Sequence, residues 1–189
     1  GHTVGTGFFG TGILNQMLTE QGAVEDAWKM MLQTAFPSWL YPVTQGATTI
    51  WEHWDGMKDD GSMWSADMNS FNHYAYGAIG EWMYRAMAGI EADPEHPGFK
   101  HAILYPRIGG NLKYTAGKYH SIYGDVGVKW EVQGKQITLT VQIPVNTTAE
   151  IRLDQAKSVL ESDGLTFIRE ADYMAAEAGS GTYQIVFEQ

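Results

Sequence analysis

The stretch Ile137-Thr138-Leu139-Thr140-Val141-Gln142-Ile143 alternates apolar and polar residues with a period of two. Successive side chains of a β-strand point to opposite faces, so this pattern predicts a strand with one buried face. Gln133-Gly134-Lys135 just before it predicts a hairpin turn, with residues 126–132 as the partner strand. Residues 150–153 and 183–187 have the same character. Several short strands separated by Gly and Asn turns predict an antiparallel β-sandwich.

The first half of the chain has a different periodicity. Residues 12–20 repeat apolar side chains at helical spacing, at Ile13, Leu14, Met17 and Leu18. The same spacing predicts a second helix over residues 24–36 and a third over about residues 70–90. We expect the apolar stripes of these helices to be core residues. In the second half, residues 156–160 and 171–176 are interpreted as short helical turns.

The change of character lies near residue 93. Six of the seven Trp and eight of the nine Met precede Glu91, and the sequence after it is rich in Val, Ile, Thr and Tyr. The segment from Glu91 to Gly98 contains two Pro and a Gly, which are typical of a boundary. The sequence therefore predicts two domains, residues 1–92 and residues 93–189.

Composition excludes several classes of protein. The chain has 189 residues, 44% of them hydrophobic, and a formal net charge of -10. Such an acidic chain is unlike nucleic-acid-binding proteins, which present a basic face. No apolar run reaches the length of about 20 residues that spans a membrane. There are no cysteines, so neither a disulfide nor a thiolate is available, and the compartment stays open between cytoplasm, periplasm and secretion.

The run Thr48-Thr49-Ile50-Trp51-Glu52-His53-Trp54 is the first candidate for chemistry. Sugar rings stack on the faces of Trp and Tyr, and a carboxylate between such rings suits the acid, base or nucleophile of sugar hydrolysis. The alternative is a buried structural carboxylate in an aromatic core. Trp39 and Tyr41, in the Pro-rich loop before this run, are further candidates for substrate contact.

Three blocks carry a resemblance to a known family. They are His2-x-x-x-Gly5-Thr6-Gly7-Phe8-Phe9-Gly10-Thr11, the block from Tyr41 to Trp54, and the block from Ser70 to Tyr84. In this order and spacing they resemble the C-terminal part of the bacterial alpha-L-rhamnosidases, a family of inverting glycoside hydrolases. The resemblance implies an α+β fragment, in which the last helices of an (α/α)6 barrel are followed by an antiparallel β-sandwich.

The resemblance also implies roles. Glu52 matches the position proposed as the general base, and His73 matches a His that contacts a rhamnose hydroxyl. Trp51, Trp54, Trp39, Tyr41 and His2 are the further predicted substrate contacts. The general acid of the family lies far upstream, so it is expected outside this chain, and the chain alone is expected to be inactive.

The expected partners are a rhamnosyl glycoside as substrate and, for the helical half, the remainder of the barrel or a second copy of the chain. Neither a nucleic acid nor a membrane is expected. We predict no cofactor and no metal, since Asp55, Asp59, Asp60 and Asp67 do not have the spacing of a calcium loop. A non-catalytic carbohydrate-binding or purely structural role is the alternative.

Overall fold

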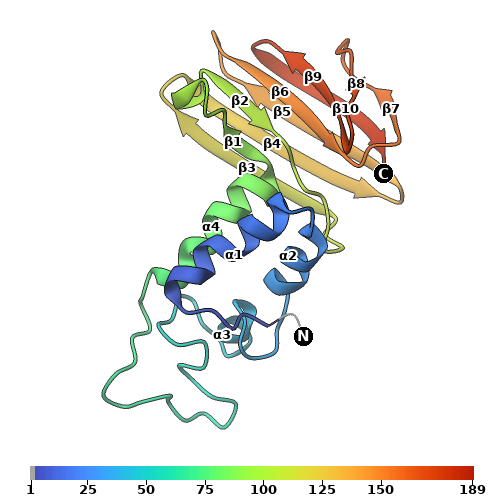
Figure 1. Ribbon diagram of the computed structural model, residues 1–189. Helices are drawn as coiled ribbons and strands as arrows, with labels where there is room; N and C mark the ends of the chain where they lie inside the picture. The colour runs from blue at the N-terminus through green and yellow to red at the C-terminus, as the bar shows by residue number, and fades with distance from the viewer. Residues whose placement is uncertain (1–2) are drawn as a thin grey trace. The chain divides into compact units, whose positions relative to one another are not determined.

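The computed structural model describes residues 3–189, which fall into two compact units that divide between Trp82 and Met83. Each unit is described by itself. The first is helical and the second is a β-sandwich (Figure 1). Within residues 3–189, no helix has both the length and the apolar character that crossing a membrane requires.

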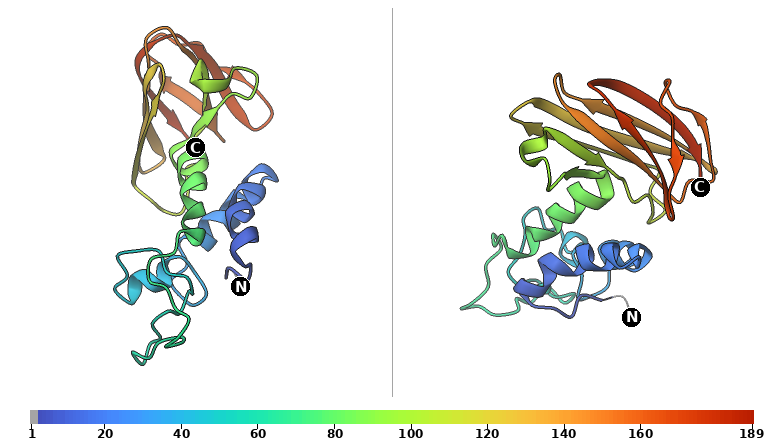
Figure 2. Two further views of the ribbon diagram at one scale, coloured as in Figure 1. Left: turned by 90° about the vertical axis from the view of Figure 1, so that its left-hand side faces the viewer. Right: turned by 45° about the horizontal axis from the view of Figure 1, so that its top comes forward.

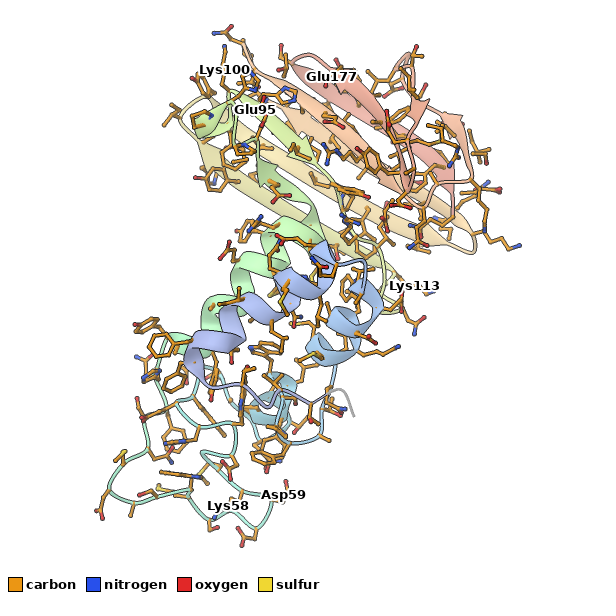
Figure 3. The ribbon with its side chains drawn as sticks, in the orientation of Figure 1. Lys58, Asp59, Glu95, Lys100, Lys113 and Glu177 are labelled. Atoms are coloured by element: carbon orange, nitrogen blue, oxygen red, sulfur yellow. The ribbon has the colours of Figure 1, made fainter. Side chains whose placement is uncertain are left out.

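The helical unit contains few regular elements. Its helices are α1 (Phe8–Glu20), α2 (Val24–Met31), α3 (Leu40–Thr44), the 3-10 helix η1 (Ala75–Ala78) and α4 (Ile79–Trp82). A long irregular segment, residues 45–74, joins α3 to η1 and contains the Glu52 run. Figure 3 shows Lys58 and Asp59 on its loop.

Helix α1 buries polar residues and exposes apolar ones. Thr11, Asn15 and Thr19 are its buried side chains. Asn15 donates from Nδ2 to the carbonyl of Ala27 at 3.0 Å. The stripe predicted from the sequence is therefore wrong in part, because Ile13 and Met17 are exposed and Leu14 and Leu18 only half-buried.

Helix α2 buries the face predicted for it, including Trp28 and Met31. The ring of Trp28 packs edge-on against Trp82 of α4, with centroids 5.1 Å apart. The helix ends at Met31, five residues before the predicted end, in a tightened turn in which Gln33 donates its N–H to the Met30 carbonyl at 3.4 Å.

The third predicted helix is shorter than expected. It begins at Ala75, because Ser70 and His73 form backbone hydrogen bonds with the segment around Glu52. The π-helix η2 (Met83–Ala88) follows α4 in the chain, and Ile90 lies in a strand. The domain boundary at residue 92 stays a prediction.

The second unit consists of two five-stranded sheets that lie face to face (Figure 2). One has the order β1-β2-β6-β9-β8 and the other β3-β4-β5-β10-β7. Every pairing is antiparallel except that of β2 with β6, which is parallel. The strands are β1 (Ile90–Ala92), β2 (His101–Leu104), β3 (Tyr114–Ser121), β4 (Gly124–Gln133), β5 (Gln136–Ile143), β6 (Thr148–Asp154), β7 (Ser158–Glu161), β8 (Ile168–Arg169), β9 (Tyr173–Ala178) and β10 (Gly181–Glu188), and a short 3-10 helix, η3 (Pro97–Phe99), precedes β2.

The alternation that predicts the sandwich is confirmed. Strand β5 buries Ile137, Leu139, Val141 and Ile143, and β4 and β5 form the predicted hairpin, with Gln133 opposite Gln136. The buried residues of both sheets form one continuous apolar core. The two predicted helical turns are wrong. They correspond to β7 and β9, which pair with neighbouring strands, and in β9 this pairing overrides the helix propensity of the alanines.

Gly89 links η2 to β1 in a backbone conformation with φ of 77°. Its carbonyl accepts the Tyr105 N–H at 2.8 Å. A Cβ atom there would lie 2.1 Å from the backbone nitrogen of Pro106. Trp130 closes the core nearby by donating from Nε1 to the Met87 carbonyl at 2.9 Å.

Candidate active site

Two segments distant in sequence pair beside Glu52. The Glu52 N–H donates to the Ser70 carbonyl at 2.9 Å, and the His73 N–H donates to the Ile50 carbonyl at 2.8 Å. Thr49 adds a side-chain hydrogen bond to the Phe71 carbonyl. The structure therefore places the segments that carry Glu52 and His73 side by side, although no strand forms there.

The Glu52 carboxylate is half-buried and held by the main chain. Its Oε2 accepts the N–H of Ser70 at 2.9 Å. Its partner is thus a backbone amide, whereas a structural carboxylate in a core is usually paired with Arg or Lys. With Oε2 fixed, Oε1 is the oxygen through which Glu52 can act on another molecule.

The His73 ring is oriented by its neighbours. Nδ1 accepts the Ala75 N–H at 3.4 Å, and the Phe8 ring of α1 stacks on the imidazole with centroids 4.9 Å apart. Because Nδ1 accepts, the proton of a neutral ring belongs on Nε2. His73 can then donate a hydrogen bond from Nε2.

Three of the predicted substrate contacts are packed rings. The Trp54 ring stacks on Tyr76 with centroids 3.6 Å apart and meets Trp39 edge-on at 5.6 Å. Trp39 donates from Nε1 to the Tyr76 carbonyl at 3.0 Å. Trp51 packs edge-on against Phe71 at 5.1 Å. All three Trp are buried, with 6–8% exposed.

Tyr41 is buried as well. Its hydroxyl donates to Oδ1 of Asp59 at 3.0 Å. Burial and, after it, this hydrogen bond raise the pKa of Tyr41, and burial alone raises that of Tyr76. Both phenols therefore keep their protons at neutral pH. His2, the remaining predicted contact, lies outside the described residues.

Some neighbours of the site carry no signal in the sequence. The amide of Ser70 and the ring of Phe8 are recognisable only once the segments are paired. Trp64 stacks on His53 with centroids 3.7 Å apart and is 43% exposed, and Tyr74 is 89% exposed.

Residues 3–189 contain no group of three His, Asp or Glu side chains suited to a metal ion.

Two family models match the chain. The bacterial alpha-L-rhamnosidase 6 hairpin glycosidase domain matches residues 1–87, and the bacterial alpha-L-rhamnosidase C-terminal domain matches residues 89–166. An alpha-L-rhamnosidase of Streptomyces avermitilis is 41% identical over 95% of this chain and 17% of that protein. One of Alteromonas sp. strain LOR is 31% identical over 97% of this chain. The chain spans a fifth or less of the length of these curated relatives.

Solved structures agree. The crystal structure of the Streptomyces avermitilis alpha-L-rhamnosidase complexed with L-rhamnose superposes with a TM-score of 0.90 at 38% identity, over 98% of this chain and 18% of that one. The alpha-L-rhamnosidase of Aspergillus terreus gives a TM-score of 0.84 at 32% identity, over 97% and 20%. In both, the matching region is a small part of a longer chain.

Proposed function

Because this chain belongs to the bacterial alpha-L-rhamnosidase family, we propose that it contributes the general base and part of the sugar site of an enzyme that removes terminal alpha-L-rhamnose from glycosides with inversion. Inversion requires two carboxyl groups, one protonating the leaving oxygen and one activating a water on the opposite face of the sugar. This chain would supply the second group, and the general acid would lie in the part of the barrel outside it.

The observation that carries this proposal is the Ser70 N–H to Glu52 Oε2 hydrogen bond, 2.9 Å long. A base must point at its water in a fixed direction, because misplacement costs rate. One anchored oxygen gives Glu52 such a direction and leaves the other oxygen for the water. His73, from the paired segment, would donate from Nε2 to a sugar hydroxyl.

The buried rings suit a supporting role better than a stacking one. Trp51, Trp54 and Trp39 are covered by other aromatic rings, so we propose that they and Tyr41 hold the loop of Glu52 in place. The exposed rings near Glu52 and His73 in sequence are Trp64 and Tyr74. These have free area for a sugar to stack on.

We further propose that the remainder of the barrel covers helix α1. Phe9, Ile13 and Met17 lie four residues apart and are 96%, 64% and 49% exposed. Residues at this spacing share one helix face. An apolar face of this kind is typical of a surface that packs on another part of a protein. Trp28, Met31 and Trp82 are buried, by contrast, so they take no part in this exposed face.

The test is Glu52→Gln in the complete enzyme. The rate constant kcat should fall by a factor on the order of 10² or more, because base assistance is worth about that much, while KM changes little. Asp55→Asn in the same loop is the matched control and should retain the rate.

A near-normal kcat for Glu52→Gln would refute the assignment of the base. If that variant still bound L-rhamnose in a calorimetric titration while its kcat was unaffected, the alternative of a carbohydrate-binding segment would hold. Loss of both binding and soluble protein would instead point to a purely structural carboxylate.

A further inference from the structure

A cleft lies in the β-sandwich and shares no residue with the site of Glu52. It has a volume of about 650 Å³. This is within the range of about 300 to 1,000 Å³ typical of small-molecule sites. Six side chains matter for its chemistry: His96, Lys100, His101, Thr148, Glu177 and Ser180.

The sheet itself brings these residues together. The parallel pairing of β2 with β6 sets His101 beside Thr148, and the pairing of β6 with β9 sets Glu177 opposite Glu150. The turn from β9 to β10 adds Ser180. Figure 3 shows Lys100 and Glu177 at the same end of the sandwich. The cleft is therefore built on strand ends, which are rigid supports.

Hydrogen bonds hold the wall of the cleft in place. Lys100 donates from Nζ to the Asn146 carbonyl, and the Thr148 N–H donates to the Lys100 carbonyl at 3.2 Å. Asn146 adopts a left-handed backbone conformation, with φ of 62°. These contacts tie the turn before β6 to the residue before β2, so the wall is formed before a ligand arrives.

Both imidazole rings are fixed through the same ring nitrogen. Nδ1 of His96 lies 2.7 Å from Oδ2 of Asp93, and Nδ1 of His101 lies 2.7 Å from Oγ1 of Thr148. The ring centroids are 5.6 Å apart. Nε2 is the remaining hydrogen-bonding atom of each ring, so two imidazoles of fixed orientation offer adjacent polar atoms.

The set of groups favours a neutral, hydroxyl-rich ligand. Lys100 donates, Glu177 accepts, and the hydroxyls of Thr148 and Ser180 do both. An anion would be attracted by Lys100 but repelled by the carboxylates of Glu177 and Asp93. Each hydroxyl of a sugar both donates and accepts, which matches a mixed set. We propose that this cleft binds a neutral saccharide, as an accessory site of the chain.

Chemical protection of histidines tests the proposal on the intact chain. Diethyl pyrocarbonate modifies accessible imidazoles, and peptide mapping reports each His separately. L-rhamnose and methyl α-D-glucoside are the probes. At a sugar concentration about four times the dissociation constant, modification of His96 and His101 should be about fivefold slower. His120, which bonds Asp125 on the other sheet, is the internal control and should be unaffected.

Variants separate this site from the rest of the chain. Glu177→Ala should abolish the protection, whereas its matched control Glu161→Ala, on β7, should retain it. Glu52→Gln should also retain it, so a failure here is distinct from a failure of the proposed catalytic role. The proposal is overturned if neither sugar protects His96 and His101, or if inorganic phosphate protects them at lower concentration than the sugars.

Discussion

The strands of the sandwich and helix α1 of the helical unit bury their side chains in opposite ways. In the sandwich, alternate apolar residues of both sheets point inward and form one closed core. In the helical unit, α1 turns Thr11, Asn15 and Thr19 inward and leaves Phe9 and Ile13 exposed. The sandwich satisfies its own apolar surface, whereas the helical unit gains order from specific hydrogen bonds and packed aromatic rings. The sandwich therefore closes its own core, whereas α1 presents the exposed apolar face that we propose the remainder of the barrel covers.

Trp130→Ala should break the sandwich core with the largest effect on stability. The side chain has 0% exposure and donates a hydrogen bond to Met87. Removing a buried Trp costs about 3 to 5 kcal/mol of unfolding free energy. Urea unfolding of the sandwich measures this loss of free energy, and Trp64→Ala, at a half-exposed side chain, is the control. A loss below about 1 kcal/mol would mean that the sandwich core is looser than described.

Thr19→Val should show how much one buried hydrogen bond contributes to the stability of the helical unit. Trp82 donates from Nε1 to Oγ1 of Thr19 at 2.8 Å in a buried setting. Valine has a similar size but leaves the indole N–H without that acceptor, which costs about 1 to 3 kcal/mol. Thr34→Val, at an exposed loop position, is the matched control. Equal unfolding midpoints for the two variants would contradict this view of α1.

Asp154 should make the stability of the sandwich depend on pH. Burial raises the pKa of its carboxyl group above the ordinary value of 3.8, against the opposing effect of Arg107. The folded state therefore holds the proton more tightly than the unfolded state. The stability that this provides is present below 3.8 and is lost as pH rises through the raised pKa. Asp154→Asn should lose this pH-dependent part of the stability. The stability of wild type relative to the variant should therefore fall as pH rises from 3.8 through the raised pKa of Asp154. A constant difference would show that the carboxyl is not perturbed.

Ile13→Lys should have the smallest effect on folding and a clear effect on association. The side chain is 64% exposed on α1. Exposed substitutions of this kind change stability by less than about 0.5 kcal/mol. Sedimentation of the 189-residue chain should show less self-association than wild type. Val43→Lys, on α3, is the control. Unchanged association would show that the apolar stripe of α1 is not what the chain uses to associate.

The fold of the sandwich could be predicted where pattern and pairing agree. The alternation of residues 137–143 predicts β5 to within one residue, because one face is buried along its whole length. Strand β9 could not be predicted, since its Ala residues favour helix and only the pairing with β6 makes it extended. The helix propensity of a short segment therefore predicts its structure poorly where hydrogen bonds to a distant strand are available.

In the helical unit, the apolar stripe predicted for α1 is only partly buried. Helical spacing indicates that Ile13 and Met17 share a face but does not tell what covers that face. The third helix starts late because Ser70 and His73 pair with the chain around Glu52, a contact 18 to 23 residues away in sequence. The residues themselves indicate the run around Glu52, whereas the roles of Glu52 and His73 follow from the family resemblance. The anchoring amide of Ser70 required the structure.

The turn at Gly89 has a consequence for mutational tolerance. Its φ of 77° disfavours every L-residue with a side chain, and any Cβ would lie 2.1 Å from the Pro106 nitrogen. Neither a small nor a flexible substituent relieves this collision, because the obstacle is main chain. In a library of all single substitutions scored for soluble yield, position 89 should be depleted for all nineteen replacements, alanine included. A glycine at this point is thus a stricter requirement than most of the apolar core.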